Sequence, residues 1–475
     1  MNDLNGGIHM FETMKLSKYN FSTYDVEGNL IMYNFLTGIP SLTKIMKQDV
    51  NKFTQLFLTD AEIQSIACEG YSEAVNNLLQ KGILVAADTN EEVLYDAKCY
   101  DEVYDSKLNL TILPTGQCNF RCPYCFETPQ SFAREPMTME AQKAILKYVQ
   151  KAIPNHRALH ISWFGGEPLL TPEIIKHLSE KFIQICNVRH LPYSADITTN
   201  GYLLDADMFD MLYKLKVYDY IITIDGVKEQ HDRRRFTCDG AGTYDVIMKN
   251  LLRIRDNKQY KFANIMIRVN MSKGFIENLD EFIQELSHSF SDDARFRFVF
   301  VPVVKFSGSK FSDNNLYHNH GELFSQLFRN DTYMTKLYTD EQKISSIIQQ
   351  KKCPAALKNS YVITPDLKVY KCNAHYDFDA NKIGYISLNG SMLLDENLHR
   401  RWFLTGKVVN KVPDICKNCY YLPCCFMVNS GCPVGHLKPT PDAFSCPLEE
   451  EKRKKDIVDA LLYAVNKYPC ITITV

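Results

Sequence analysis

The chain has 475 residues, of which 45% are hydrophobic and 23% are charged, and its formal net charge is −2. This composition is that of a globular protein of about three domains, and it excludes wholesale disorder, collagen-like repeats and a strongly basic nucleic-acid-binding protein. No apolar run of about 18 residues predicts a membrane span, and the first residues do not read as a secretory signal. We therefore expect a cytoplasmic protein without a membrane or nucleic-acid partner. The unusual feature is the content of 16 cysteines.

The cysteines are concentrated in two groups. The first contains Cys118, Cys122 and Cys125, and the second contains eight cysteines between residues 353 and 446. In a reducing compartment, clustered cysteines bind metal or carry out chemistry more often than they form disulfides. Scattered single cysteines fit better as small buried hydrophobic residues.

Residues 1–105 are expected to form a small α+β domain of winged-helix type. Strand-like alternation on both sides of the turn at Glu27–Asn29 predicts a hairpin. Residues 61–67 and 72–80 have helical patterns, and a further strand is expected at 82–86.

Residues 106–310 alternate between apolar, β-rich runs and amphipathic stretches. This alternation implies right-handed crossovers and a parallel sheet, and the apolar runs fit a sheet covered on both faces. We predict an α/β fold with a partial, TIM-like (β/α)6 barrel and its chemistry at the carboxyl ends of the strands. The expected strands are 108–113, 159–164, 195–199, 220–224, 265–269 and 296–301, and the expected helices are 138–152, 173–187, 206–215, 244–256 and 276–287.

Three further segments follow the barrel. Residues 311–350 are expected to be a helical connector, 351–450 a cysteine-rich domain, and 451–475 a helix and tail. The cysteine-rich region contains a hairpin pattern at 361–370 but few apolar helices, so we expect bound metal to supply its stability.

The first cysteine group lies on the loop after the first barrel strand. Three thiolates on one loop can hold three corners of a four-iron cluster, which ordinarily has four cysteine ligands, so one iron would stay open to a small molecule. A zinc ion would need a fourth ligand, and no histidine lies nearby in the sequence to complete a tetrahedral site.

The pattern CxxxCx(aromatic)C, with Tyr124 as the aromatic residue, resembles the signature of the radical S-adenosylmethionine (SAM) superfamily. Further motifs resemble that family at the ends of successive strands: Gly165, Gly166 and Glu167 after the second strand, Thr199 and Asn200 after the third, Asp225 after the fourth, and Arg268 and Asn270 after the fifth. The resemblance covers about residues 108–303. It implies a SAM-binding barrel whose first cluster is held by Cys118, Cys122 and Cys125.

The resemblance also implies roles for these residues. The open iron would bind the amine and carboxylate of SAM, and one-electron reduction would release a 5′-deoxyadenosyl radical. The methionine ammonium would lie at Gly165, Gly166 and Glu167. The remaining cofactor-binding residues would be Tyr124, Thr199, Asn200, Arg234, Arg268 and Asn270.

Two assignments keep alternatives. Asp225 either faces the cavity as a catalytic acid–base group or caps the following helix. The basic run Arg233–Arg235 is either solvated or places Arg234 against the cofactor carboxylate or an acidic peptide.

The second cysteine group resembles the SPASM domain. Leu367 stands where that family usually has glycine, the last short cysteine spacing is six residues instead of three, and Cys424 beside Cys425 leaves the assignment ambiguous by one residue. By resemblance, one auxiliary [4Fe–4S] cluster would be held by Cys416, Cys419, Cys425 and Cys446, and a second by Cys353, Cys372 and Cys432. The second cluster is either completed by Cys424, His375 or another side chain, or it keeps an open iron, which we favour. Structural zinc sites are the alternative.

The order of domains resembles the maturases of ribosomally made peptides. The resemblance implies SAM, three [4Fe–4S] clusters, a flavodoxin- or ferredoxin-type electron donor, and a precursor peptide whose leader binds residues 1–105 by adding a strand. We expect hydrogen abstraction followed by a crosslink, with a cysteine thioether favoured. The alternatives are a sulfatase-maturing enzyme that makes formylglycine and a zinc-stabilised binding protein without catalysis. The N-terminal domain is alternatively a dimerisation or capping module.

Overall fold

The computed structural model describes residues 13–57, 63–64, 72–128, 130–272, 278–303, 352–408, 416–425, 433–437, 451–468 and 471–473. The chain divides into two compact units. The smaller one, called here the terminal unit, contains residues 1–103, 340–353 and 404–475, and the larger one, the barrel unit, contains residues 104–339 and 354–403.

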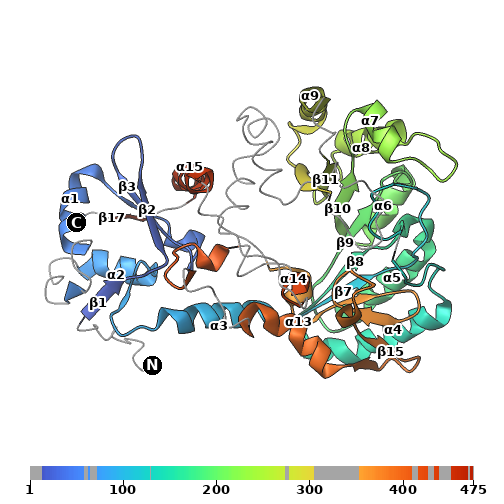
Figure 1. Ribbon diagram of the computed structural model, residues 1–475, viewed down its shortest axis with the longest axis horizontal. Coiled ribbons are helices and arrows are strands. Elements are labelled where there is room, and N and C mark those ends of the chain that lie inside the picture. Colours follow the sequence, from blue (N-terminus) through green and yellow to red (C-terminus); the bar gives the residue numbers. More distant parts are fainter. Residues whose placement is uncertain are drawn as a thin grey trace. The chain divides into compact units, whose positions relative to one another are not determined.

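The barrel unit is built on six parallel strands that lie in sequence order across the sheet (Figure 1). They are β7 (Lys107–Ile112), β8 (Ala158–Trp163), β9 (Tyr193–Thr199), β10 (Val217–Thr223), β11 (Asn264–Met271) and β12 (Phe296–Pro302). The helices are α4 (Met139–Ala152), α5 (Pro172–Val188), α6 (Ala206–Lys214), α7 (Lys228–Arg234), α8 (Tyr244–Asp256) and α9 (Leu279–Phe290), with short 3₁₀ turns η3 (Ile153–Asn155) and η4 (Pro168–Leu170). The predicted partial (β/α)6 barrel is confirmed. Helix α7 was not predicted, because its basic sequence has no apolar periodicity.

Four more strands extend this sheet beyond β7. Strand β13 (Ser360–Ile363) pairs in parallel with β7, and β14 (Lys368–Tyr370), β15 (Lys382–Ile386) and β16 (Met392–Leu394) follow as an antiparallel meander. The hairpin predicted at 361–370 is confirmed. The 3₁₀ turns η7 (Pro354–Ala356) and η8 (Asp379–Asn381) and helix α13 (Glu396–Val408) flank these strands. Residues 354–403 of the expected cysteine-rich region thus complete the barrel sheet.

The barrel strands alternate in burial, which the apolar runs had not predicted. In β8, Leu159 and Ile161 are fully buried on the face that α5 covers, whereas His160 and Ser162 are half-buried on the opposite face. The apolar face supplies the core, because burying aliphatic side chains under helices is the main stabilising contribution. The opposite, inner face carries polar side chains into the barrel lumen.

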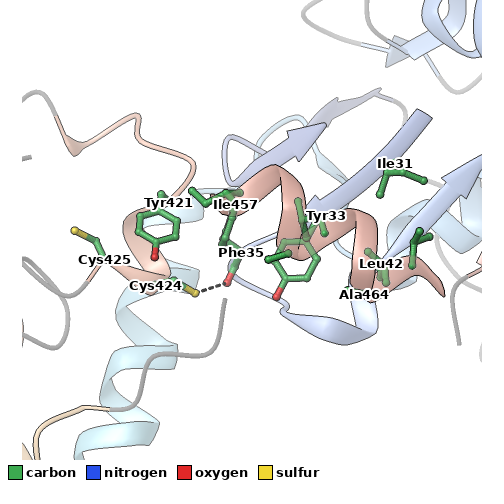
Figure 2. Packing of buried hydrophobic residues seen from close by; sticks show 12 residues of the cluster. Ile31, Tyr33, Phe35, Leu42, Tyr421, Cys424, Cys425, Ile457 and Ala464 are labelled. Atoms are coloured by element: carbon green, nitrogen blue, oxygen red, sulfur yellow. Dashed lines mark hydrogen bonds between the residues drawn. The ribbon is translucent and has the colours of Figure 1, made fainter. Parts of the chain in front are cut away.

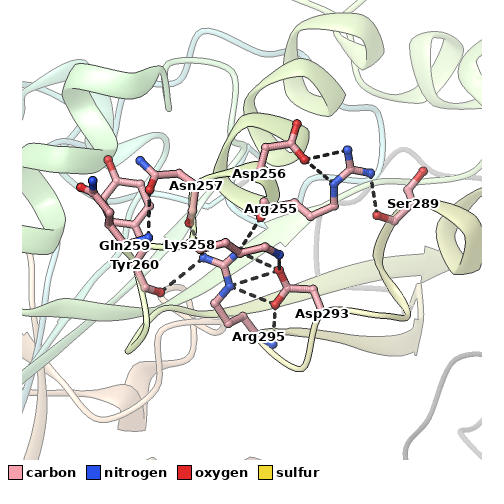
Figure 3. Close-up of polar contacts among 9 residues, drawn as sticks. All are labelled: Arg255, Asp256, Asn257, Lys258, Gln259, Tyr260, Ser289, Asp293 and Arg295. Atoms are coloured by element: carbon pink, nitrogen blue, oxygen red, sulfur yellow. Dashed lines mark hydrogen bonds and ion pairs between the residues drawn. The ribbon is translucent and has the colours of Figure 1, made fainter.

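An ion pair of half-buried residues joins two connections at the amino-terminal ends of the strands (Figure 3). The Asp293 carboxylate accepts hydrogen bonds from Arg295 Nε at 2.9 Å and Nη2 at 2.7 Å, and from Lys258 Nζ at 3.0 Å. Arg295 also donates to the carbonyl oxygens of Asn257 and Arg255. The hydrogen bonds from Arg295 hold the pKa of Asp293 well below its usual range. This network stabilises the barrel at the amino-terminal ends of its strands, the end that contributes to stability and not to catalysis in such folds.

The terminal unit contains two small sheets, ordered β17-β4-β3-β2 and β5-β1-β6. Its strands are β1 (Thr13–Leu16), β2 (Asn20–Tyr24), β3 (Leu30–Asn34), β4 (Thr43–Ile45), β5 (Ile63–Gln64), β6 (Leu84–Ala86) and β17 (Ile471–Ile473). Its helices are η1 (Ile39–Ser41), α1 (Lys47–Phe57), α2 (Ser72–Gln80), α3 (Glu91–Val103), η10 (Leu422–Cys424), α14 (Pro433–Leu437) and α15 (Glu451–Lys467). None of the helices in the described ranges is long and apolar enough to cross a membrane.

The local predictions for this unit are mostly confirmed. The hairpin β2–β3, helix α2 and strand β6 lie where the sequence placed them. The helix expected at 61–67 is wrong over Ile63–Gln64, which forms β5 because it pairs with β1. Tertiary pairing has overridden the local helical pattern.

The two ends of the chain share one core in the terminal unit (Figure 2). Strand β17 pairs in parallel with β4, and Ile457 and Leu461 of α15 pack with Tyr33 and Phe35 of the N-terminal sheet region. All four side chains are fully buried. Cys424 and Cys425 lie in the same cluster. The N-terminal sheet therefore folds together with part of the second cysteine group.

Candidate active site

The first cysteine group lies on a loop that is tied to the segment after α7. Cys118, Cys122 and Cys125 follow β7 and are half-buried. Phe120 forms an antiparallel bridge with Thr237. Two amides extend this contact, since Arg121 N donates to Phe236 O at 2.9 Å and Cys238 N donates to Asn119 O at 2.8 Å. The loop is thus held in shape by the protein itself.

The environment of Cys118 and Cys122 suits metal ligands better than free reactive thiolates. Burial raises the pKa of Cys118 to about 12 and that of Cys122 to about 11. Without metal these thiols are protonated, and a bound metal would displace the protons. The amide of Phe120 lies 3.4 Å from Cys118 Sγ, and such N–H···S contacts tune iron–sulfur clusters.

Gly165 and Gly166 allow the next motif to lie directly against this loop. A Cβ on Gly166 would come within 2.2 Å of the Gln117 carbonyl oxygen, and Gly165 has φ +120°, which favours glycine. Glu167 N donates to the same Gln117 oxygen at 2.8 Å. The backbone contact between the two motifs requires the glycines.

Glu167 joins the ends of β8 and β9. Its fully buried carboxylate accepts hydrogen bonds from Thr199 Oγ1 at 2.7 Å and Asn200 N at 2.7 Å, and from Leu169 N at 3.0 Å. Burial raises the pKa of Glu167, and these hydrogen bonds oppose that shift. Asn200 Nδ2 in turn donates to Asn119 Oδ1 on the cysteine loop at 2.8 Å. These contacts bring Glu167, Thr199 and Asn200 together beside the cysteine loop.

Tyr124 joins the cysteine loop to β10 and β11. Its hydroxyl donates to Asp225 Oδ2 and accepts from Arg235 Nη1 at 2.9 Å. Asp225 Oδ1 accepts from Asn270 N at 2.8 Å, and Asn270 Oδ1 accepts from Arg268 Nε at 2.9 Å. Burial raises the pKa of Tyr124 well above its ordinary value, so the phenol is neutral. Tyr124, Asp225, Arg268 and Asn270 therefore form one network.

The three arginines of the basic run Arg233–Arg235 lie in three different environments. Arg233 is exposed, Arg234 is half-buried, and Arg235 is 7% exposed. Arg234 Nη2 donates to Asn270 O at 3.0 Å, and its guanidinium lies 5.2 Å from the Tyr124 ring centroid. Although burial opposes the charge of Arg235, its neighbours Tyr124 and Cys122 raise its pKa further. The expectation of a solvated run is wrong for Arg235, which sequence reasoning had not selected.

Asp225 does not cap the following helix. The N-cap of α7 is Val227, without a side-chain cap. The Asp225 amide instead donates to His231 Nδ1 at 3.1 Å, so the ring proton lies on Nε2, 3.0 Å from Thr243 Oγ1. The Thr243 hydroxyl donates to Arg235 O. His231 is thus a buried neutral residue that positions Asp225, and no sequence pattern had indicated it.

The residues at these strand ends fit an iron–sulfur cluster. Three thiols lie on one restrained loop, and the buried Nε of Arg235 has no hydrogen-bond partner among the described residues. A buried cation next to Cys122 suits the negative charge that thiolate ligands bring. In the described part of the chain, no three His, Cys, Asp or Glu side chains gather as ligands of a single metal ion.

The auxiliary cysteines are distributed over both units. Cys372 lies in the barrel unit, and its Sγ is 3.4 Å from the Ala374 amide, as Cys118 is from Phe120. Cys353, Cys416, Cys419 and Cys425 lie in the terminal unit, while Cys432 and Cys446 lie outside the described residues.

Leu367 adopts a left-handed backbone conformation. Its φ is +64°, in the left-handed region, where glycine is the usual residue. The glycine that the SPASM pattern has at this position therefore has a physical reason, since Leu367 itself adopts the left-handed conformation.

Comparison with known proteins decides the family of the barrel. Residues 112–284, which contain the cysteine loop and all the strand-end motifs described above, match the radical SAM superfamily. The chain has a radical SAM domain. This radical SAM enzyme is therefore expected to use SAM and one [4Fe–4S] cluster, and the match favours it over a zinc-stabilised protein without catalysis.

Similar proteins share parts of this radical SAM enzyme. A cysteine-type anaerobic sulfatase-maturating enzyme of Clostridium novyi is 26% identical over 68% of this chain and 87% of its own length. The radical SAM cyclopropyl synthase TigE of Paramaledivibacter caminithermalis is 23% identical over 52% of each chain. The solved structure of anSMEcpe with bound AdoMet has a TM-score of 0.52 at 19% identity and covers 76% of this chain and 97% of that one.

A further solved structure extends over more of the chain. Streptococcus suis SuiB bound to S-adenosylmethionine has a TM-score of 0.50 at 15% identity and covers 91% of this chain and 99% of that one. At these identities the two structures establish the likeness in fold.

The buried His231 predicts a pH dependence of stability. Burial lowers its pKa well below the ordinary value, so only the unfolded chain takes up a proton as the pH falls through about 6.5. The folded state should therefore lose about 1.4 kcal/mol from this group between pH 7.5 and 5.5. In His231→Gln, whose amide can keep both hydrogen bonds, urea unfolding at the two pH values should show a loss smaller by that amount. The exposed control His288→Gln should behave as the wild type, and an undiminished loss in His231→Gln would contradict the assignment.

Proposed function

We propose that this radical SAM enzyme matures a ribosomally made peptide by removing hydrogen from one residue and forming a crosslink, with a cysteine thioether as the favoured bond. The relatives that share its fold support a peptide substrate. The solved structure of anSMEcpe with bound AdoMet and the Cp18Cys peptide has a TM-score of 0.53 to this chain.

The observation that carries the proposal is the composition of the terminal unit. Four cysteines, Cys416, Cys419, Cys424 and Cys425, lie in two hydrophobic clusters together with residues of the N-terminal sheet region. Figure 2 shows Cys424 and Cys425 in the first of these clusters. Strand β2 is the last strand of its sheet among the described residues, and Tyr24 on it is 55% exposed. A free edge strand next to a thiol-rich core suits a unit that binds a peptide by strand addition and holds an iron–sulfur cluster.

The strand-end residues of the barrel would hold and orient the cofactors. When bound, the cluster and SAM supply a 5′-deoxyadenosyl radical that removes a hydrogen atom from the peptide. Cys118, Cys122 and Cys125 would ligate three irons, and Gly165, Gly166 and Glu167, which lie against the same loop, would bind the methionine ammonium of SAM. Arg235 balances the charge of the ligated thiolates, and the Tyr124 network keeps the loop fixed.

The auxiliary cysteines would complete the electron path. We assign Cys416, Cys419, Cys425 and Cys446 to one auxiliary [4Fe–4S] cluster. A second would be held by Cys353, Cys372 and Cys432, with an iron open to the donor thiolate of the peptide. A flavodoxin- or ferredoxin-type protein would reduce the enzyme.

The bond changes of thioether formation balance. A C–H and an S–H bond break and a C–S bond forms, so the peptide loses two hydrogens. One leaves as a hydrogen atom to 5′-deoxyadenosine. The other leaves as a proton, and its electron passes to an oxidised auxiliary iron–sulfur cluster.

A sulfatase-maturing activity is the second candidate, because the Clostridium novyi relative matches this chain over 87% of its own length. To separate the two, the chain is co-expressed with the short cysteine-containing peptide encoded beside its gene, if one is present, and separately with a sulfatase-type cysteine peptide. Loss of two hydrogens from the first peptide, with the cysteine blocked to alkylation, supports thioether formation. A hydrazide-reactive aldehyde on the second peptide supports formylglycine formation instead.

Replacing Cys118, Cys122 and Cys125 together by alanine should remove the first cluster. We expect the anaerobically reconstituted variant to lose about four irons per chain and all dithionite-dependent release of 5′-deoxyadenosine. Iron analysis, electron paramagnetic resonance and chromatography measure this. Undiminished iron content with normal deoxyadenosine release would remove the basis of the proposal.

Cys424→Ala tests the open iron. Cys424 is 5% exposed, and its Sγ lies 3.9 Å from the Phe35 carbonyl oxygen, an arrangement suited to packing. We expect this variant to keep its full iron content and to lose at most the stability of one small buried side chain. Loss of about four irons per chain would show that Cys424 is a ligand and would reject the open site. Cys425→Ala is the matched variant that should lose iron.

Tyr24→Asp tests peptide binding at the edge of β2. A charge on the added-strand surface should weaken binding of a fluorescently labelled leader half of the adjacent peptide about tenfold, or about 1.4 kcal/mol. Fluorescence anisotropy measures the affinity. Tyr385→Asp on β15, whose side chain is 51% exposed, serves as the control and should bind normally. Equal affinities of the two variants would favour a dimerisation or capping role for this domain.

A further inference from the structure

A polar cluster lies on the inner face of the barrel, on the two strands that lead into the Gly-Gly-Glu and Thr-Asn motifs. The parallel register of β8 and β9 places His160 beside Ser194 and Ser162 beside Asp196. The residues that alternate with them, Leu159, Ile161, Ala195 and Ile197, are buried, whereas these four are half-buried. The cluster therefore faces the lumen.

Three short hydrogen bonds hold this cluster together. His160 Nε2 lies 2.7 Å from Asp196 Oδ2, and Nδ1 lies 2.8 Å from Ser194 Oγ. Ser162 Oγ donates to the same Asp196 oxygen at 2.7 Å. The side chains of His160 and Asp196 are 21% and 24% exposed, so both are open to a group that enters the lumen.

The contacts prepare the imidazole to take up a proton. In the arrangement of these hydrogen bonds, Nε2 donates to Asp196 Oδ2 and Nδ1 accepts from the Ser194 hydroxyl. When Nδ1 becomes protonated, the Ser194 hydroxyl rotates and accepts from it, and Asp196 balances the new charge. A histidine oriented in this way by a carboxylate is the arrangement that serves general bases.

Packing of the barrel interior does not explain why these four positions on β8 and β9 carry polar residues. The lumen of a closed (β/α)8 barrel is filled mainly by branched apolar side chains, and a half-buried charge carries a desolvation cost that an apolar residue avoids. Here β8 and β9 carry four polar residues at adjacent inner positions, below the strand ends where the radical SAM motifs lie.

We propose that His160 accepts the proton that the peptide loses during crosslinking, with Asp196 as the residue that positions it; this inference rests on the proposed function. The hydrogen atom would go to the 5′-deoxyadenosyl radical. The donor thiol would give its proton, through the Ser194 hydroxyl, to His160 Nδ1 as it becomes the iron-bound thiolate, and the electron released when the C–S bond forms would go to an oxidised auxiliary iron–sulfur cluster. The proton later passes to water in the lumen. The polar cluster around His160 would thus receive the hydrogen that leaves as a proton, while SAM provides the acceptor for the one that leaves as an atom.

The test uses His160→Gln, which keeps a polar side chain but no basic nitrogen. The probe is the peptide on which the wild type forms product, deuterated at the carbon that loses hydrogen. We expect normal iron content, an unchanged KM and continued transfer of deuterium into 5′-deoxyadenosine, while kcat for product falls about 10²-fold or more. Asp196→Asn should also lower kcat, and Asp196→Glu should recover part of it. His177→Gln is the matched control, since that histidine contacts Gln142 on α4, outside the lumen.

The outcomes are distinguishable. Product formation by His160→Gln at the wild-type rate, or a raised KM with an unchanged kcat, overturns the role of His160. Absence of product and of deuterium transfer in the wild type itself overturns the proposed function.

A second measurement needs no peptide. Diethylpyrocarbonate should modify His160, whose side chain is 21% exposed, in the intact enzyme but spare His231, which is fully buried. Mass spectrometry of the digest locates the modification. An unmodified His160 would show that the lumen does not admit even a small reagent and would overturn the proposal.

Discussion

The hydrogen bond from Tyr124 to Asp225 is the contact on which the geometry of the site depends. Asp225 follows β10 and binds the amide of Asn270 in β11, so the cysteine loop after β7 is fixed to strands on the other side of the barrel. His231 and Arg235 hold the two partners in place. Because the phenol is neutral and the carboxylate is buried, the bond is strong and directional.

The two ends of the barrel have different tasks. At the amino-terminal ends of the strands, Arg295 and Asp293 use their charges to join connections, and their contacts are complete within the chain. At the carboxyl ends, the thiols of the cysteine loop and the buried Nε of Arg235 present groups suited to a cofactor. The polar lumen positions between these ends fit a barrel that holds a substrate, because a closed apolar core would leave no room for one.

The sequence predicted those parts of the site whose geometry is local. The cysteine loop could be found because a cluster needs closely spaced cysteines, and Gly165–Gly166 could be found because a close backbone contact needs glycines. Both features are visible in the sequence itself. The burial of Arg235 could not be found, since three successive arginines look alike until α7 turns one of them inward. The roles of His231 and Asn119 depend on partners far away in sequence. Leu367 was rightly seen as a departure, but only its positive φ explains why glycine is usual there.

The composition of the terminal unit has a consequence for assembly. Strand β17 completes a sheet of N-terminal strands, and α15 and the cysteines near 424 pack into the same core as β3. The side chains of this shared cluster, among them Tyr33, Phe35 and Ile457, are buried only when both ends of the chain are in place. If metal binds at Cys416–Cys425, as proposed, its binding free energy also stabilises the N-terminal sheet, because a site that forms only in the folded state couples ligation to folding. Peptide binding and iron–sulfur cluster assembly would then both depend on the cooperative folding of the terminal unit.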